Sequence, residues 1–234
     1  MSTAPAIIIP PGVTVFCDPT LGPAMRSLDG VSRAQAGAPV SVLSAPAMSM
    51  LAQLQRHTRN DVLFTLSSAM DQAVKFGLVR PETRIDGFTN LLVLAGLVGH
   101  VPTGNAGLPR MLAGTKLAVT DNTVASGLDG RAVLDANGLT QAAGNGVMGA
   151  ANTADIVFLI MTGVVDVGLV YLTDVRAEAR LTVLSTLTAD PALTNYSGAV
   201  NKKAVSPNAQ ALLNVMRGYQ GHKVLRDAGL EIAS

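Results

Sequence analysis

Short runs of β-branched and apolar residues alternate with stretches of helical spacing along most of the chain. A short apolar run between turn residues is typical of a buried strand, whereas apolar residues three and four positions apart form one face of a helix. The expected strands are residues 13–16, 39–43, 61–66, 91–96, 116–120, 166–172 and 181–187, and the expected helical regions are 47–57, 68–79, 125–138, 153–163 and 206–229. This alternation predicts an α/β fold with mostly parallel sheets.

Composition argues against several classes of protein. The 234 residues, 48% of them hydrophobic, are enough to bury a large core in one domain or in two small ones. The 17 basic and 16 acidic residues nearly balance and form no basic stripe, so we expect no nucleic-acid partner. Cys17 is the single cysteine and the three histidines lack ligand-like spacing, so we expect no metal and no cofactor. The apolar runs are too short to span a bilayer, so we expect no membrane insertion.

The cellular compartment stays open. The start of the chain, MSTAPAIIIPPGVTVF, lacks the basic residues and the long apolar stretch of a secretory signal. We therefore expect a periplasmic protein if a signal peptide was removed, and a cytoplasmic one if Met1 is the native start.

Hydroxyl and amide side chains fall at or just before the expected starts of several helices. They are Thr20, Ser44 and Ser49, Thr123 and Ser126, and Asn152 and Thr153. In an open parallel sheet these loops meet at the carboxyl ends of the strands, where helix N-termini offer unpaired backbone N–H groups to an anion. Each such residue alone is also an ordinary helix cap. As a set, they favour a site for a small anion.

Several segments link the chain to a known family through their order and spacing. They are VTVFCDPTLGPAM (13–25), DVLFTLSSAMDQAVKFGLV (61–79), NTADIVFLIMTGVVDVGLVYLTD (152–174) and SPNAQALLNVMRGYQGHKVLRDAGLEI (206–232). Together they resemble the molybdate-binding family of bacterial solute-binding proteins over nearly the whole chain. The resemblance implies a type II periplasmic-binding-protein fold, in which two α/β lobes are joined by two crossover strands and close on the ligand. Lobe one would comprise residues 1–90 and 197–234, and lobe two residues 91–196.

The resemblance also implies a set of ligand-binding residues. Thr20 falls where the family has a serine after the first strand, and Tyr171 matches a tyrosine whose hydroxyl reaches the oxyanion. Ser126 and Thr153 fall in loops that donate backbone N–H groups. The second loop of the family carries a Ser-Gly pair, whereas this chain has APAMSM, so Met48 or Ser49 takes that place, and we expect Ser49 to be the ligand residue.

Asp18 and Pro19 replace small residues of the family and bring a carboxylate close to the expected anion site. Asp18 is either a turn former or, in an enzyme, a base that moves a proton next to a carboxylate.

Two functions follow from the resemblance. The first is a solute-binding protein that delivers a small oxyanion or organic carboxylate to the membrane permease of an ABC-type transporter. The alternative is an isomerase of a small unsaturated organic acid, similar to aconitate isomerases on the same scaffold, with Asp18 or, less favoured, Cys17 as the catalytic group. A cytoplasmic sensor domain is a third and weaker interpretation, because no DNA-binding segment accompanies it.

Overall fold

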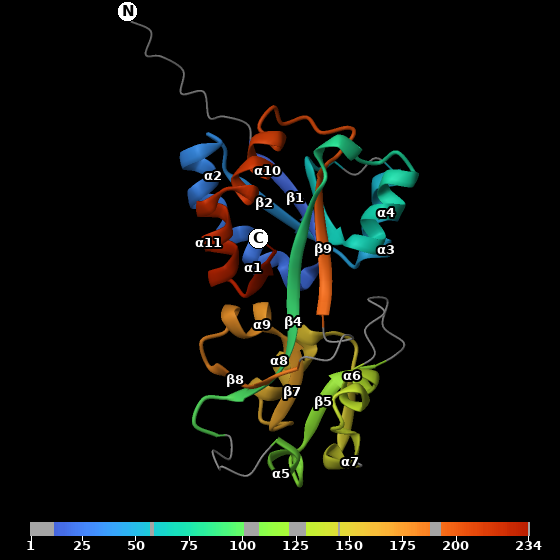
Figure 1. The fold of residues 1–234 in the computed structure, drawn as a ribbon, viewed down its shortest axis with the longest axis vertical. Helices are drawn as coiled ribbons and strands as arrows, with labels where there is room; N and C mark the ends of the chain where they lie inside the picture. The colour runs from blue at the N-terminus through green and yellow to red at the C-terminus, as the bar shows by residue number, and fades with distance from the viewer. Residues whose placement is uncertain are drawn as a thin grey trace, which may run out of the picture.

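The computed structural model describes residues 12–56, 59–100, 108–121, 130–144, 146–187 and 193–233. Strands and helices alternate through these residues and form two bodies, one above the other in Figure 1. None of the helices in these ranges is long and apolar enough to cross a membrane.

The first body, which is the upper one in Figure 1, contains one group of strands. They are β1 (Val13–Cys17), β2 (Val40–Ser44), β3 (Val62–Leu66), β9 (Leu193–Val200), β10 (Leu230–Ile232) and the first half of β4 (Ile85–Leu97). Strand β1 pairs in parallel with β2 and β3, whereas β9 is antiparallel to both β3 and β4. The carboxyl ends of β1, β2 and β3 therefore lie at one edge of this sheet, together with the amino end of β9.

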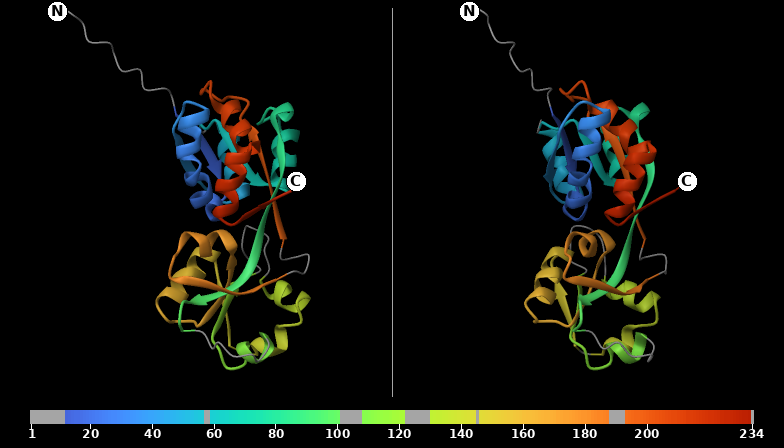
Figure 2. Two further views of the ribbon diagram at one scale, coloured as in Figure 1. Left: turned by 60° about the vertical axis from the view of Figure 1, so that its left-hand side comes forward. Right: turned by 90° about the vertical axis from the view of Figure 1, so that its left-hand side faces the viewer.

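The second body contains the other half of β4 with the remaining strands. They are β5 (Leu117–Thr120), β6 (Val147–Ala150), β7 (Val167–Tyr171) and β8 (Leu181–Thr186). Strand β5 pairs in parallel with β6 and β7, and the second half of β4 lies between β7 and β8 as an antiparallel neighbour of both. Because β4 changes partners along its length, it runs from one body into the other, as Figure 2 shows.

Helices cover the sheets of both bodies. In the first body these are α1 (Gly22–Ser27), α2 (Asp29–Gln35), α3 (Ala47–Gln55), α4 (Ser67–Lys75), α10 (Ala209–Arg217) and α11 (Tyr219–Asp227), with the 3-10 turns η1 (Pro19–Leu21) and η2 (Pro81–Thr83). In the second body they are α5 (Leu108–Leu112), α6 (Gly130–Ala136), α7 (Thr140–Ala143), α8 (Thr153–Met161) and α9 (Leu172–Ala177).

Both faces of the central strands β3 and β7 are buried, which explains their apolar runs in the sequence. In β3, Val62 and Phe64 pack into one core of the first body, whereas Leu63 packs into the core on the opposite face. In the second body, Leu169 and Val170 divide in the same way between two cores. A strand that is covered on both sides carries few polar residues.

The packing of α8 against β7 positions the strand that ends in Tyr171. Asn152 caps α8, because its side chain accepts a hydrogen bond of 2.9 Å from the backbone N–H of Asp155. A Cβ atom at Gly168 would overlap Ile156 and would lie 2.8 Å from Ile160 Cδ1, so only glycine permits this close approach of helix and strand.

The expectation of mostly parallel sheets is wrong for the middle of the fold. Every pairing of β4 and β9 is antiparallel, because these two strands connect the bodies in opposite directions. The sequence pattern of buried strands does not distinguish the two arrangements. The predicted α/β alternation is confirmed, and the predicted boundaries of the two lobes stay a prediction.

Candidate functional site

Tyr171 ends β7 and places its hydroxyl at the junction of the two bodies. The side chain is buried, and its hydroxyl is hydrogen-bonded to Thr194 Oγ1 at 3.2 Å and also to Tyr196. Thr194 and Tyr196 lie on β9, which belongs to the sheet of the first body. The backbone N–H of Tyr171 donates to Asp174 Oδ2 at 3.0 Å, which caps α9 and fixes the end of the strand.

Asp18 and Thr20 form a tight turn at the carboxyl end of β1. Asp18 Oδ1 accepts hydrogen bonds from the backbone N–H of Thr20 at 3.3 Å and from Thr20 Oγ1 at 3.1 Å. Asp18 thereby caps η1, and the turn-forming interpretation of this residue is confirmed. The Thr20 hydroxyl also contacts the Tyr196 hydroxyl in a hydrogen bond.

These contacts join four hydroxyl side chains, which we call the hydroxyl cluster: Thr20, Tyr171, Thr194 and Tyr196. The cluster connects the turn after β1 with the end of β7 through two side chains of β9. The structure therefore brings together two of the predicted ligand residues, Thr20 and Tyr171, and places Asp18 beside them. Thr194 and Tyr196 carry no motif that identifies them in the sequence, although two residues at a spacing of two lie on the same face of a strand.

Burial dominates the electrostatics of this region. It raises the pKa of Tyr171 to about 12 and the pKa of Tyr196 well above its ordinary value, and the charge of Asp18 adds to both shifts. Burial likewise raises the pKa of the Cys17 thiol to about 12. Both phenols and the thiol are therefore neutral at physiological pH, so Cys17 lacks the thiolate character of a nucleophile.

The two carboxyl groups beside the cluster also titrate abnormally. Burial raises the pKa of Asp18, and the two hydrogen bonds from Thr20 oppose that shift. Burial raises the pKa of Asp174 to about 6, while contacts with Thr153 and with the Tyr171 backbone N–H lower it and the charge of Asp18 raises it further. A buried carboxyl group is harder to ionise because the charged form loses its hydration.

Thr153 occupies the first turn of α8 and has an unsatisfied hydroxyl. The residue is 2% exposed, and its Oγ1 has no hydrogen-bond partner of good geometry among the described residues. Asn90 on β4 also has an unsatisfied polar atom. Its Nδ2 donates a hydrogen bond of 2.8 Å to Thr173 Oγ1, whereas its buried Oδ1 has no hydrogen-bond partner in the described ranges. A buried polar atom left without a partner costs free energy, so it marks a place for a ligand or a water.

The remaining predicted ligand residues lie apart from the hydroxyl cluster or outside the residues that the structure describes. Ser49 is exposed within α3, and its side chain makes no hydrogen bond in the described part of the chain. Ser126 lies outside the described residues. The cysteine thiol contacts another hydroxyl of the first body, since Cys17 Sγ lies 3.7 Å from Ser44 Oγ. Within the described ranges, no group of three or more His, Cys, Asp or Glu side chains is placed to hold a metal ion.

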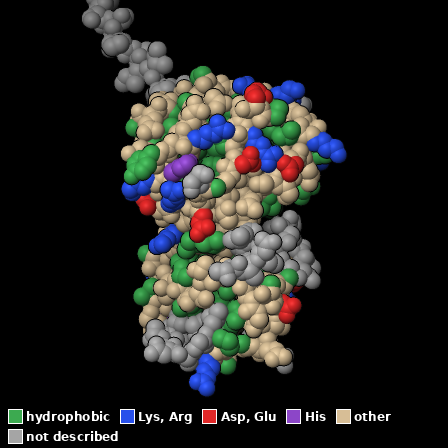
Figure 3. Space-filling model, viewed as in Figure 1, with side chains coloured by type: hydrophobic (Ala, Val, Ile, Leu, Met, Phe, Trp, Pro, Cys, Tyr) green, Lys and Arg blue, Asp and Glu red, His purple; other side chains and the backbone are tan. Residues whose placement is uncertain are grey.

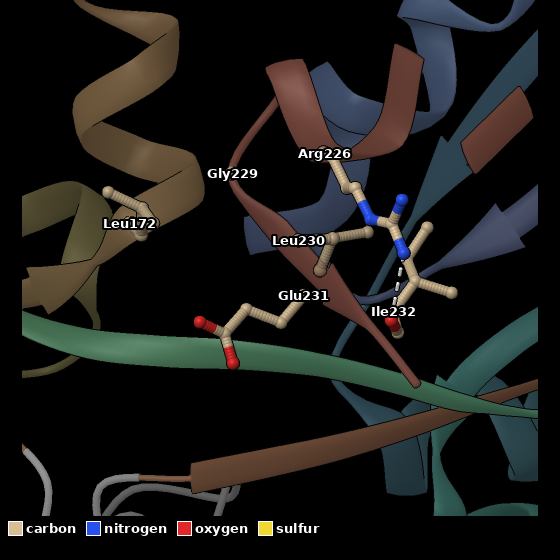
Figure 4. Close-up of a pocket in the computed structure, with 6 residues that line it drawn as sticks. All are labelled: Leu172, Arg226, Gly229, Leu230, Glu231 and Ile232. Carbon is tan, nitrogen blue, oxygen red and sulfur yellow. Dashed lines mark hydrogen bonds between the residues drawn. The ribbon is translucent and has the colours of Figure 1, made fainter. Parts of the chain in front are cut away.

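Two surface hollows lie near the junction, and none of the predicted ligand residues lines either of them. In the space-filling view, the outline of the molecule is narrower where the two bodies meet (Figure 3). One hollow, of about 420 Å³, lies where β10 faces the start of α9, with Leu172 across from Leu230 and Glu231 (Figure 4). Arg226 Nη2 closes one side by donating a 3.2 Å hydrogen bond to the Ile232 carbonyl oxygen. The other hollow, of about 340 Å³, lies between α1, α9 and α11.

Comparison with known protein families classifies the chain. The model of a family described as bacterial extracellular solute-binding protein matches residues 13–231. The chain belongs to this family. The predicted resemblance to bacterial solute-binding proteins is thereby confirmed, and no match was found among curated proteins.

Solved structures show the same fold at low sequence identity. The molybdate-binding protein of Azotobacter vinelandii superposes with a TM-score of 0.77 at 19% identity, over 95% of this chain and 100% of that one. A substrate-binding domain assigned to a molybdenum ABC transporter of Clostridium difficile gives 0.76 at 18% identity, over 96% and 100%. The sulfate-binding protein SubI of Mycobacterium tuberculosis gives 0.67 at 15%, over 96% and 88%. The predicted two-lobed, type II periplasmic-binding-protein fold is thus confirmed for this solute-binding protein.

Proposed function

We propose that this solute-binding protein binds a small anion, either an oxyanion or an organic carboxylate, between its two bodies and delivers it to the permease of an ABC-type transporter. Membership of the family supports solute binding. The similar structures include proteins named for molybdate and for sulfate, which supports an oxyanion.

The observation that carries the proposal is the hydroxyl cluster. Its members come from both bodies and are neutral at physiological pH, because burial raises the pKa of both tyrosines. Neutral O–H donors bind an anion without a buried counter-charge, and each such bond is stronger when the acceptor is ionised. A ligand that accepts from Tyr171 and lies against the turn at Thr20 would touch both bodies at once.

The start of α8 supplies a second part of the proposed site. Its helix dipole favours negative charge near Thr153, whose buried hydroxyl lacks a well-formed bond among the described residues. We include Ser49 and Ser126 in the proposed ligand set because of the family resemblance.

The proposed lobes meet along the two connecting strands. Lobe one comprises residues 1–90 and 197–234, and lobe two residues 91–196. The change of partners along β4 supports the boundary near residue 90, because Leu91 still pairs with β9 whereas Leu92 pairs with β7. The second boundary falls within β9, which pairs with strands of the first body from Leu193 onward.

A thermal-shift panel of oxyanions, di- and tricarboxylates, neutral sugars and simple cations tests the proposal. A bound anion at about a hundred times its dissociation constant adds roughly 2.7 kcal/mol to the free energy of unfolding, which raises the melting temperature by roughly 5 to 10 °C in a chain of this size. Stabilisation by sugars or cations alone would contradict the proposal.

A matched pair of α8 variants tests the role of Thr153. Thr153→Val removes a buried hydroxyl whose described contact, with Asp174, lacks good hydrogen-bond geometry, so the stability without ligand should change by less than about 1 kcal/mol while the anion-induced shift becomes smaller. Thr162→Val at the other end of the helix removes a hydroxyl that bonds the Phe158 carbonyl oxygen, and it should leave the anion-induced shift unchanged.

One observation favours the isomerase alternative. Asp18 is buried beside the hydroxyl cluster and its pKa is raised, which suits a general base better than an ordinary carboxylate. Its Oδ1 is already an acceptor for Thr20, so a proton would have to move through Oδ2.

A further inference from the structure

Asp18 gives the proposed anion site an acceptor where a site for a fully ionised oxyanion needs donors. The residue is 8% exposed. Its Oδ1 accepts from the backbone N–H and the hydroxyl of Thr20, so both of those donors are engaged within the turn. Its Oδ2 makes no hydrogen bond in the described part of the chain.

The groups that face Asp18 from the neighbouring elements are acidic or neutral. Asp18 caps η1, and η1 packs against α9, which follows Tyr171 in the chain. The Asp18 charge also raises the pKa of Tyr171 on β7, of Tyr196 on β9 and of Asp174 on α9. The Cys17 thiol on β1 experiences the same charge.

No basic side chain neutralises Asp18 within the described ranges. None of the ion pairs found there includes this carboxylate. Arg26 on α1 is exposed, and its guanidinium group lies beside Gly22 and Ser44. A Cβ atom added to Gly22 would lie 3.3 Å from Arg26 Nη1 and 3.4 Å from Ser44 Oγ. Arg176 on α9 is exposed as well.

An ionised carboxylate and a fully ionised oxyanion repel each other strongly in a buried site. One proton between the two oxygens changes this repulsion into a charge-assisted hydrogen bond, which is stronger than a bond between neutral groups. A ligand that meets the Oδ2 atom would therefore be favoured if its own oxygen carries a proton and disfavoured if it has no proton to donate.

We propose that Asp18 restricts the site to oxyanions that bring an acidic proton, with hydrogen phosphate as the simplest member of the class, and that it disfavours fully ionised sulfate and molybdate. This inference rests on the anion-binding function proposed above. Asp18 would then distinguish the ligand of this chain from the molybdate and the sulfate in the names of two similar structures.

Titration calorimetry at pH 7 with inorganic phosphate, sulfate and molybdate tests the inference on three proteins. The wild type should bind sulfate and molybdate roughly a hundredfold more weakly than phosphate, the scale of one lost hydrogen bond to a charged group. Asp18→Asn supplies a donor in place of the acceptor, so it should bind sulfate at least about tenfold more tightly than the wild type. Asp227→Asn removes an equal charge from an exposed pair with Lys223 and should behave as the wild type.

The outcomes separate this inference from the function on which it rests. Wild-type binding of sulfate or molybdate as tight as that of phosphate would overturn the role of Asp18 and leave anion binding intact. Binding of a di- or tricarboxylate by the wild type, with no binding of any of the three inorganic anions, would overturn the inference alone. Failure of both the wild type and Asp18→Asn to bind any of the three anions or any carboxylate of the thermal-shift panel would overturn the proposed function and the inference together.

A pH series on the wild type keeps the test valid if Asp18→Asn does not fold. Sulfate binding would require a protonated Asp18, so its affinity should rise about tenfold for each unit by which the pH falls toward the pKa of Asp18. A sulfate affinity that stays constant with pH would contradict the inference.

Discussion

Replacing Tyr171 with phenylalanine removes one hydroxyl from the centre of the proposed site and leaves the ring in place. The hydroxyl is buried and has two partners, Thr194 and Tyr196. An intramolecular hydrogen bond contributes about 0.5 to 1.5 kcal/mol to stability, so the variant should lose about 1 to 2 kcal/mol of unfolding free energy. For a chain of this size the melting temperature should fall by roughly 2 to 8 °C.

Ligand binding should suffer more than stability. A hydrogen bond to a charged ligand contributes about 1.5 to 3 kcal/mol, which corresponds to roughly ten- to a hundredfold weaker binding of the anion. Calorimetry with the most stabilising anion of the thermal-shift panel measures this loss. The melting temperature of the same samples without ligand measures how much of the change is a loss of folding stability.

Tyr219→Phe is the matched control for this experiment. It removes the same hydroxyl from a residue that is 79% exposed, so both stability and affinity should stay within about 0.5 kcal/mol of the wild type. If Tyr171→Phe and Tyr219→Phe give the same melting temperature and the same affinity, the Tyr171 hydroxyl neither joins the bodies nor contacts the ligand.

Further changes test other parts of the structure. Gly229→Ala should lower the free energy of unfolding by about 2 kcal/mol or more, because φ is +100° and a Cβ atom would lie 2.9 Å from both the Leu172 carbonyl carbon and the Thr173 nitrogen. Gly37→Ala is the control: its φ is +67° and a Cβ atom there would have no neighbour within 4 Å, so it introduces backbone strain without a steric clash. Denaturant melts measure both changes. The folded-state pKa of Asp174, about 6, exceeds its ordinary 3.8, so its contribution to stability is fully present below about pH 4 and is lost as the pH rises through about 6. Chemical denaturation should therefore show the wild type losing stability relative to Asp174→Asn across that interval, and parallel curves would contradict the assignment. If the chain is an isomerase, incubation with an aconitate-like acid in deuterated water should introduce deuterium at the carbon next to a carboxylate. Asp18→Asn should slow this exchange about a hundredfold. The absence of exchange in every acid that binds would exclude the isomerase.

The sequence predicts the elements of the fold better than their pairing. The apolar runs of β1, β3 and β7 identify these strands to within about a residue, because both faces of each strand are buried. Strand β4 begins at Ile85, before the expected range of 91–96, because its first half, IDGFTN, has only two apolar side chains and lacks the pattern of a buried strand. Strand β6 was hidden in a Gly/Ala-rich stretch that carries no strand pattern.

The candidate site was predictable only in part, because its parts come from distant segments. Thr20 and Tyr171 were found through motif positions, and the structure brings both into the hydroxyl cluster. Thr194 and Tyr196 are not among the predicted residues because the sequence pattern predicts no strand over 193–200, and pairing between distant strands leaves no local signal. The capping role of Asp18 follows from turn chemistry, whereas its closeness to Tyr171 and Asp174 depends on tertiary structure.

Backbone amide hydrogen exchange with and without the most stabilising anion tests directly whether that anion binds between the two bodies. A ligand that contacts both bodies should slow exchange together in the peptides that contain Thr20, Thr153 and Tyr171, because local opening of each segment then requires release of the ligand. The peptide of the exposed helix residue Tyr219 serves as an internal reference and should be unchanged. Protection confined to one body, or to the hollow lined by Gly229 and Glu231, would contradict binding at the hydroxyl cluster.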